Sequence, residues 1–276
     1  MNETRVLLEG LGFPESTRWH DGRVWLCNWG SGEVLAMTPD AKPEVVARLA
    51  PQTVPFSIDW LPDGRLLVLD GPQRLLLAQQ SPDNPLEVVA DLSALGPAPL
   101  NELVVDGKGN AYVNGPGGAV VLVRPDGTFE QVADGLEFPN GMALVDDGRT
   151  LVVADSYAQE LVGYDVGHDG TLSRRRVWAQ LEHAPDGICA DADGAIWVAS
   201  VPGEGCVRVR EGGEVLDGIT PDRGCFACML GGEDGRTLFI GAATWAGMDA
   251  AMTEGPGLTG RLLAAPGQPA AHAGRP

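Results

Sequence analysis

Short apolar segments follow turns of Asp and Gly along the whole chain. Six such turns contain a glycine, and each precedes a segment in which apolar and polar positions alternate, as in "RVWLCN" at 23–28. Alternation with a period of two is typical of a β-strand. The spacings between the turn glycines are 42, 45, 39, 46 and 41 residues, and the glycines are Gly22, Gly64, Gly109, Gly148, Gly194 and Gly235. This regular spacing indicates six repeats of one structural unit.

Each repeat contains enough strands for one blade of a propeller. A third strand follows in segments such as "GEVLAM", and a fourth in segments such as "EVVARL". A period of about 40–45 residues with several strands per repeat is typical of β-propellers. No stretch of about 10–15 residues has a convincing helical period. We therefore predict an all-β fold, with one six-bladed β-propeller domain over residues 1–276.

The two ends of the chain complement each other. The last repeat ends after "GRLLAAPG" at 260–267, before its fourth strand. Near the N-terminus, "RVLLEGL" at 5–11 resembles the fourth strands of the other repeats. We predict that Arg5–Leu11 completes the last blade, because this pairing removes an exposed sheet edge and closes the ring.

Composition and charge narrow the classes of function. The chain has 276 residues, is 44% hydrophobic and carries a formal net charge of −19, so nucleic acids and anionic membranes would be repelled. No segment approaches the eighteen or so apolar residues of a membrane span, and the first residues lack the pattern of a signal peptide. The five cysteines are scattered and odd in number, which fits a reducing compartment. We expect a cytoplasmic protein with a small-molecule substrate, either a monomer or a weak homo-oligomer.

One position of the repeat varies in polarity while its apolar neighbours are kept. It lies eight residues before the turn glycine in five repeats and seven before it in the first, and its occupants are Glu15, Phe56, Asn101, Asn140, Asp186 and Ala227. Equivalent positions of all blades converge at one end of the central axis of a propeller. Four of the six occupants carry oxygen donors, and two of these are carboxylates, a set that suits Ca²⁺. The alternative is that these side chains only cap turns, as Asn and Asp commonly do.

The segments around these residues, such as "FPNGMAL" and "PDGICADADGAIWVA", resemble the family of regucalcin, gluconolactonase and the luciferin-regenerating enzyme. The resemblance runs from about residue 6 to 265. It implies that Glu15, Asn140 and Asp186 hold one divalent cation, and that Asn101 is a fourth metal ligand or a substrate contact. It also implies a lactonase that opens cyclic esters with Ca²⁺, or with Zn²⁺, Mn²⁺ or Mg²⁺ in its place.

The predicted chemistry assigns a role to each residue of the site. A metal with open positions polarises a lactone carbonyl, and Asp186 is the predicted general base that takes a proton from the attacking water. Sugar lactonases of the family carry an Arg two residues before Asn101, where this chain has Pro99. With Phe56 and Ala227 as apolar walls, this difference favours a substrate less polar than an aldonolactone.

Two further features are candidates for substrate contacts. His183 precedes Asp186 by three residues and is placed to act as a proton shuttle, or else is simply solvated. The segment 243–259, with Trp245 and Met248, forms either a lid or an ordinary long loop.

Other functions use the same ring of residues. The first alternative is a phosphotriesterase or fluorophosphatase type of hydrolase on the same metal site. The second is a non-catalytic ligand-binding propeller, in which the polar axial residues would be dispensable. A third, a propeller like strictosidine synthase, is disfavoured because that group does not depend on such a metal site.

Overall fold

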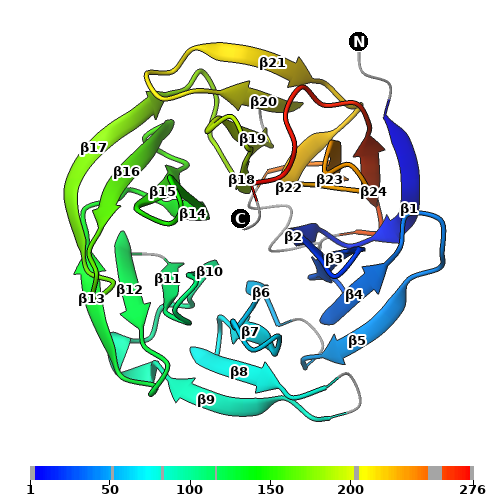
Figure 1. Cartoon of the computed structure of the whole chain (residues 1–276). Helices are drawn as coiled ribbons and strands as arrows, with labels where there is room; N and C mark the ends of the chain where they lie inside the picture. Colours follow the sequence, from blue (N-terminus) through cyan, green and yellow to red (C-terminus); the bar gives the residue numbers. More distant parts are fainter. Residues whose placement is uncertain are drawn as a thin grey trace.

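A computed structural model describes residues 4–50, 53–81, 84–115, 117–201, 205–247 and 257–273. Its strands form six four-stranded antiparallel sheets arranged around a central axis (Figure 1). One short 3₁₀ turn, Ser93–Leu95, is the helical element of the described residues. The all-β fold and the six-bladed propeller are therefore confirmed. No helix of the described residues is long and apolar enough to cross a membrane.

Each of the first three blades is formed by four strands that are consecutive in the chain. Blade one contains β2 (Pro14–His20), β3 (Arg23–Asn28), β4 (Glu33–Met37) and β5 (Glu44–Arg48). Blade two contains β6 (Phe56–Trp60), β7 (Leu66–Asp70), β8 (Leu75–Gln79) and β9 (Glu87–Asp91). Blade three contains β10 (Leu103–Val105), β11 (Ala111–Gly115), β12 (Ala119–Val123) and β13 (Phe129–Ala133). The first strand of each blade lies nearest the axis, and the fourth lies on the rim (Figure 1).

Blades four and five repeat this order, and blade six closes the ring. Blade four contains β14 (Pro139–Val145), β15 (Thr150–Asp155), β16 (Glu160–Val166) and β17 (Leu172–Gln180). Blade five contains β18 (Ile188–Ala190), β19 (Ile196–Ser200), β20 (Gly205–Val209) and β21 (Val215–Ile219). Blade six contains β22 (Gly224–Gly231), β23 (Thr237–Ala243), β24 (Gly260–Ala265) and β1 (Arg5–Leu11). The predicted closure by Arg5–Leu11 is confirmed, since β1 pairs antiparallel with β24.

Six clusters of the core lie between neighbouring blades, one for each pair, and a small seventh cluster contains Val201, Phe226 and Ala243. Alternate residues of a strand face opposite neighbours, as period-two side-chain geometry requires. In β3, for example, Trp25 and Cys27 pack towards blade two, whereas Val24 and Leu26 pack towards blade six. Both faces of the middle strands of a blade are therefore buried, which explains why strands such as β3, β7 and β12 are nearly continuous apolar runs.

The turns that begin the second strand of each blade follow the sequence prediction. The glycines of the six turns have positive φ between 70° and 87°, which glycine adopts without steric cost. Because all blades share one topology, every inner strand begins at the same end of the axis. The residue positions that vary in polarity are thereby brought to one end of the ring.

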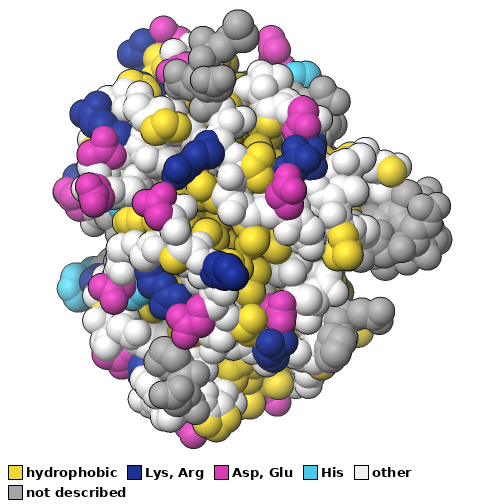
Figure 2. Space-filling model, turned by 90° about the vertical axis from the view of Figure 1, so that its right-hand side faces the viewer, with side chains coloured by type: hydrophobic (Ala, Val, Ile, Leu, Met, Phe, Trp, Pro, Cys, Tyr) yellow, Lys and Arg dark blue, Asp and Glu magenta, His cyan; other side chains and the backbone are white. Residues whose placement is uncertain are grey.

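The outer surface carries both signs of charge despite the acidic composition. On the side drawn in Figure 2, basic and acidic side chains alternate, with hydrophobic side chains between them. Ion pairs of this kind include Arg23 with Glu44 and Arg261 with Glu9. Exposed pairs of this type contribute little to stability.

Candidate metal and active site at the ring axis

The polar residues predicted from the repeats lie together at one end of the axis. The side-chain amide of Asn101 donates a hydrogen bond to Oδ1 of Asn140 at 3.3 Å, and Asn140 in turn hydrogen-bonds the Asp186 carboxylate. The negative charge of Asp186 raises the pKa of Glu15, so the two carboxylates lie within electrostatic range of each other. Side chains from blades one, three, four and five therefore meet in one site.

Two glycines allow the blades to approach one another closely at this site. A Cβ on Gly141 would lie 2.6 Å from the backbone oxygen of Asp186, and a Cβ on Gly187 would lie 2.7 Å from Cα of Ala227. Real Cβ atoms essentially never come this close. In the recurring sequences "PNG" and "PDG", the residue with a proposed ligand side chain is thus followed by a glycine, because no side chain fits at that next position. Backbone hydrogen bonds from Gly141 to Asp186 and from Gly187 to Phe226 join successive blades there.

The inner strands are irregular where they carry the predicted ligands. The register of β2 against β3 shifts between Glu15 and Arg18, and that of β14 against β15 shifts between Pro139 and Met142. Bulges of this kind change the direction of a side chain and are frequent next to active sites. Ser16, directly after Glu15, has a φ of +48°, which is uncommon for a residue other than glycine.

The two carboxylates of the site are electrostatically unfavourable in the absence of a cation. Burial raises the pKa of Glu15 well above its usual value, and the charges of Asp186 and Glu102 raise it further. Burial and the charge of Glu102 likewise raise the pKa of Asp186, against the hydrogen bond from Asn140. A divalent cation would relieve this repulsion, and the carboxylate and amide oxygens are the donors that a hard cation prefers. The residues present therefore fit a divalent cation.

An ion pair that the sequence pattern did not predict lies close to this site. Arg18 on β2 extends to Glu102, the residue after Asn101, with 3.1 Å between Nη2 and Oε1. The side chains of Arg18 and Glu102 are only 6% and 8% exposed. A signal was present in the repeat, because the position of Arg18 is occupied by the apolar residues Val104, Ala143, Cys189 and Leu230 in blades three to six.

The predicted apolar walls need correction. Phe56 is fully buried and packs with Trp25, Cys27 and Ile58 in the core between blades one and two. Its side chain therefore does not line the axis in this structure. Ala227 is 2% exposed and packs against Gly187, beside Asp186. The sequence could not settle this, because the first residue of an inner strand faces either the axis or a neighbouring blade.

The remaining predicted contacts lie near this end of the ring. His183 is exposed in the loop between β17 and β18. Trp245 is partly buried after β23, whereas Met248 and most of the proposed lid lie outside the described residues. Neither observation assigns a function to these residues.

Aromatic side chains provide an apolar surface beside the site instead. Phe13, which comes just before Pro14 and Glu15, has its ring 5.0 Å from that of Phe226 and 5.9 Å from that of Trp245. Phe226 and Trp245 lie 5.8 Å apart, so the three rings contact one another. Phe13 and Trp245 are only partly buried.

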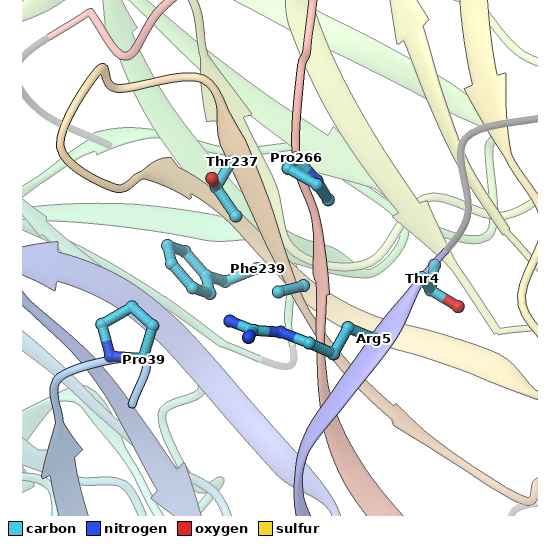
Figure 3. A pocket seen from close by; sticks show the side chains of 7 residues that line it. Thr4, Arg5, Pro39, Thr237, Phe239 and Pro266 are labelled. Carbon is cyan, nitrogen blue, oxygen red and sulfur yellow. The ribbon is translucent and has the colours of Figure 1, made fainter. Parts of the chain in front are cut away.

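Among the described residues, no group of three or more His, Cys, Asp or Glu side chains is arranged to hold a metal ion. The axial set differs from such a group because two of its four members are asparagines. A surface pocket lies elsewhere, between blade six and blade one, with a volume of about 390 Å³. Figure 3 shows the Arg5 side chain extending from β1 towards Phe239 and Pro39 in this pocket, which no predicted site residue lines.

Comparison with known proteins agrees with the fold. Residues 13–244 match the family described as SMP-30/Gluconolactonase/LRE-like region. The chain belongs to this family. The family resemblance expected from the sequence is thus confirmed.

Individual relatives of the SMP-30/gluconolactonase family are similar over different lengths. Regucalcin from Danio rerio is 32% identical over 138 residues, which is 48% of this chain and 46% of that protein. The chain therefore aligns with about half the length of this relative. A pentonolactonase from Haloferax volcanii is 24% identical over 94% of this chain and 91% of its own length. A regucalcin structure from Agrobacterium tumefaciens, described as a calcium-binding protein, superposes with a TM-score of 0.81 at 18% identity, covering 99% of this chain and 96% of that one.

Proposed function

We propose that this protein is a metal-dependent hydrolase that opens a small lactone, and that this lactone is less polar than an aldonolactone. The observation that carries the proposal is the grouping of Glu15, Asp186, Asn140 and Asn101 at one end of the axis. The similarity to a pentonolactonase over nearly the whole chain supports hydrolysis of a cyclic ester. The similarity to a protein described as calcium-binding supports Ca²⁺ as the cation.

In this proposal Glu15, Asn140 and Asp186 hold the cation, with Asn101 as a further ligand or a substrate contact. When bound, the cation supplies Lewis-acid polarisation of the lactone carbonyl. Ser156 supports Asn140 and the Asp186 loop together, because its Oγ accepts from Asn140 Nδ2 at 3.4 Å and donates to the Pro185 oxygen at 2.6 Å. Such supporting contacts fix the orientation of the ligands.

Asp186 is the proposed general base. It accepts a proton from water as the water oxygen attacks the carbonyl carbon, and the ring C–O bond then breaks. The same proton passes to the departing alkoxide oxygen, which yields the hydroxy acid. Burial and the nearby Glu102 raise the pKa of the Asp186 carboxyl in the metal-free protein, and this opposes the lowering that a bound cation would cause.

The proposal of a less polar substrate rests on the surroundings of the site. Pro99 stands where the related sugar lactonases have an arginine, and Arg18 is held by Glu102. The partly buried rings of Phe13 and Trp245 offer contact area to an apolar or planar substituent. These residues therefore offer few hydrogen-bond donors to the hydroxyl groups of a sugar.

The test combines metal content with a panel of lactones of graded polarity. We expect about one divalent cation per chain, loss of hydrolysis after chelation, and a higher kcat/KM for aromatic or alkyl lactones than for gluconolactone. Asp186→Asn, assayed with its metal still bound, should reduce kcat by roughly two to four orders of magnitude. Full activity of that metal-loaded variant would remove Asp186 from the mechanism. A wild-type protein that hydrolyses no lactone or ester would instead favour a non-catalytic binding propeller.

A further inference from the structure

A chain of buried polar groups connects the proposed ligand Glu15 with Arg18. The backbone N–H of Ser16 donates to Oε2 of Glu15 at 3.3 Å, and the Ser16 hydroxyl donates to Oε1 of Glu102 at 3.5 Å. Arg18 donates from Nη2 to the same Glu102 oxygen at 3.1 Å and to the backbone oxygen of Leu103 at 3.2 Å. These hydrogen bonds thus connect blade one with the start of blade three, beside Asn101.

The ion pair is poorly explained as a device for stability. Taking two charges out of water costs several kcal/mol for each ion, and a well-packed apolar pair often does as well. Moreover, Nε of Arg18 is buried without a hydrogen-bond partner among the described atoms. An arginine in this position is therefore better explained by what its charge does to its surroundings.

The surroundings that respond to this charge are the proposed cation ligands. Ser16 and Arg18 both donate to Oε1 of Glu102, and the backbone N–H of Ser16 also donates to Glu15, so the ion pair is linked to this proposed ligand through one residue. Asp59, the counterpart of Arg18 in blade two, is engaged elsewhere, because its oxygens accept the backbone N–H groups of Trp60 and Val105. Among the described residues, Arg18 is thus the basic group that pairs with Glu102 beside Glu15.

We infer that Arg18 sets the net charge of the axial cation site and thereby its preference for divalent over trivalent ions. Glu15, Glu102 and Asp186 contribute three negative charges and Arg18 one positive charge, so the site carries a formal charge of −2. This charge balances a divalent ion. The inference rests on the proposed cation site, but not on the identity of the substrate.

Ca²⁺ and Tb³⁺ are suitable probes because they have similar radii and prefer the same oxygen ligands while differing in charge. The dissociation constants of both ions are measured by titration calorimetry and terbium luminescence on the wild type, Arg18→Met, Glu102→Gln, the double variant and Arg18→Lys. The preference for Tb³⁺ is the Kd for Ca²⁺ divided by the Kd for Tb³⁺. Since the comparison is between variants, any other fixed charge cancels.

Charge balance predicts opposite changes in the two single variants. Arg18→Met brings the site to −3 and should raise the preference for Tb³⁺ by roughly tenfold, the order expected for one unit charge about 10 Å away in an effective dielectric near 20. Glu102→Gln brings the site to −1 and should lower the preference by a similar factor. The double variant returns the charge to −2 and should regain the wild-type preference, and Arg18→Lys should keep it.

A role of the pair that is merely structural predicts a different pattern. Loss of the salt bridge would then change the preference for Tb³⁺ in the same direction in both single variants and in the double variant, and the double variant would not regain the wild-type preference. That pattern, or an unchanged preference in Arg18→Met and Glu102→Gln, overturns the inference while the cation site stands. If Arg18→Met does not fold, Glu102→Gln and the double variant decide the question. A wild type that binds neither ion overturns the cation site, and the inference with it.

Discussion

Glu15 combines three features that are costly together for a carboxylate. It is 6% exposed, it lies near the charges of Asp186 and Glu102, and it precedes Ser16, whose φ is positive. Local strain and repulsion of this kind persist where the surrounding structure imposes them, often at functional sites. Glu15 is therefore expected to reduce the stability of the metal-free protein and to increase its affinity for a cation.

If Glu15 lowers the stability of the metal-free protein, Glu15→Gln should stabilise it. Because the folded-state pKa of Glu15 is raised, the wild type should lose stability as pH rises from the usual carboxyl range, about 4.5, through that raised pKa. Each unit of the raise corresponds to about 1.4 kcal/mol. Denaturant unfolding in the presence of chelator should therefore show Glu15→Gln to be more stable than the wild type at pH 8, and closer to it at pH 4.

The same variant should lose most of its response to metal. With one carboxylate fewer, addition of Ca²⁺ should raise the melting temperature of the wild type clearly and that of Glu15→Gln little. Asp40→Asn, which neutralises an exposed carboxylate in an ion pair with Arg5, is a suitable control and should respond like the wild type. Stoichiometric, tight metal binding by both Glu15→Gln and Asp186→Asn would show that the ligands are assigned wrongly.

Single residues of the site differ in how far the sequence could predict them. Asn140 and Asp186 stand out because the repeat keeps its apolar frame around them. The contact between Arg18 and Glu102 joins residues 84 apart, and it depends on how far the inner strands approach one another across the ring. Period and spacing give the order of the blades but not such distances, so this pair became visible only in the structure.

At the scale of elements, the start of each inner strand combines a ligand position with a close contact between blades. In blades four and five the residue after the ligand is a glycine, and its backbone packs directly against the next blade. The sequence predicted the turns and strands correctly, because their glycines and alternation are local signals. It did not predict the bulges in β2 and β14, which depend on the pairing of two strands.

The close approach of Gly141 to the backbone of Asp186 can be tested by adding one methyl group, in the variant Gly141→Ala. In Gly141→Ala the new Cβ would lie 2.6 Å from the Asp186 oxygen and 2.7 Å from the Ile188 nitrogen, so the Asp186 loop has to move. We expect a loss of about 1–3 kcal/mol in the free energy of unfolding, together with weaker metal binding.

Gly107 provides the matched control, because a Cβ there meets nothing within 4 Å and its φ is not positive. Gly107→Ala should change stability by less than about 1 kcal/mol, and in the stabilising direction if at all. Chemical denaturation and calcium titration of the two variants measure both effects. Equal behaviour of Gly141→Ala and Gly107→Ala would mean that blade four and blade five do not need this close contact.

At the scale of the whole molecule, ring closure depends on one strand from the other end of the chain. β1 pairs with β24 from Arg5 opposite Ala264 to Leu11 opposite Gly260, and Leu11 is buried beside Leu26 and Phe239. Figure 1 shows β1 on the rim of the last blade, next to blade one. The strand therefore links the two ends of the ring and covers an edge that would otherwise be open.

Deletion of residues 1–11 should consequently destabilise the whole ring rather than only blade six. The truncated protein loses the pairing partner of β24 and the buried Leu11, and the exposed edge of β24 offers unpaired backbone groups to other chains. We expect a melting temperature at least about 5–10 °C lower, the change that a few kcal/mol produces in a chain of this size, and soluble aggregates in size-exclusion chromatography. Deletion of residues 1–4, which precede β1, is the control and should leave both properties unchanged. If the protein without residues 1–11 melts at the wild-type temperature as a monomer, β1 is not needed to close the propeller, and the cohesion of the ring must come from the six clusters between the blades.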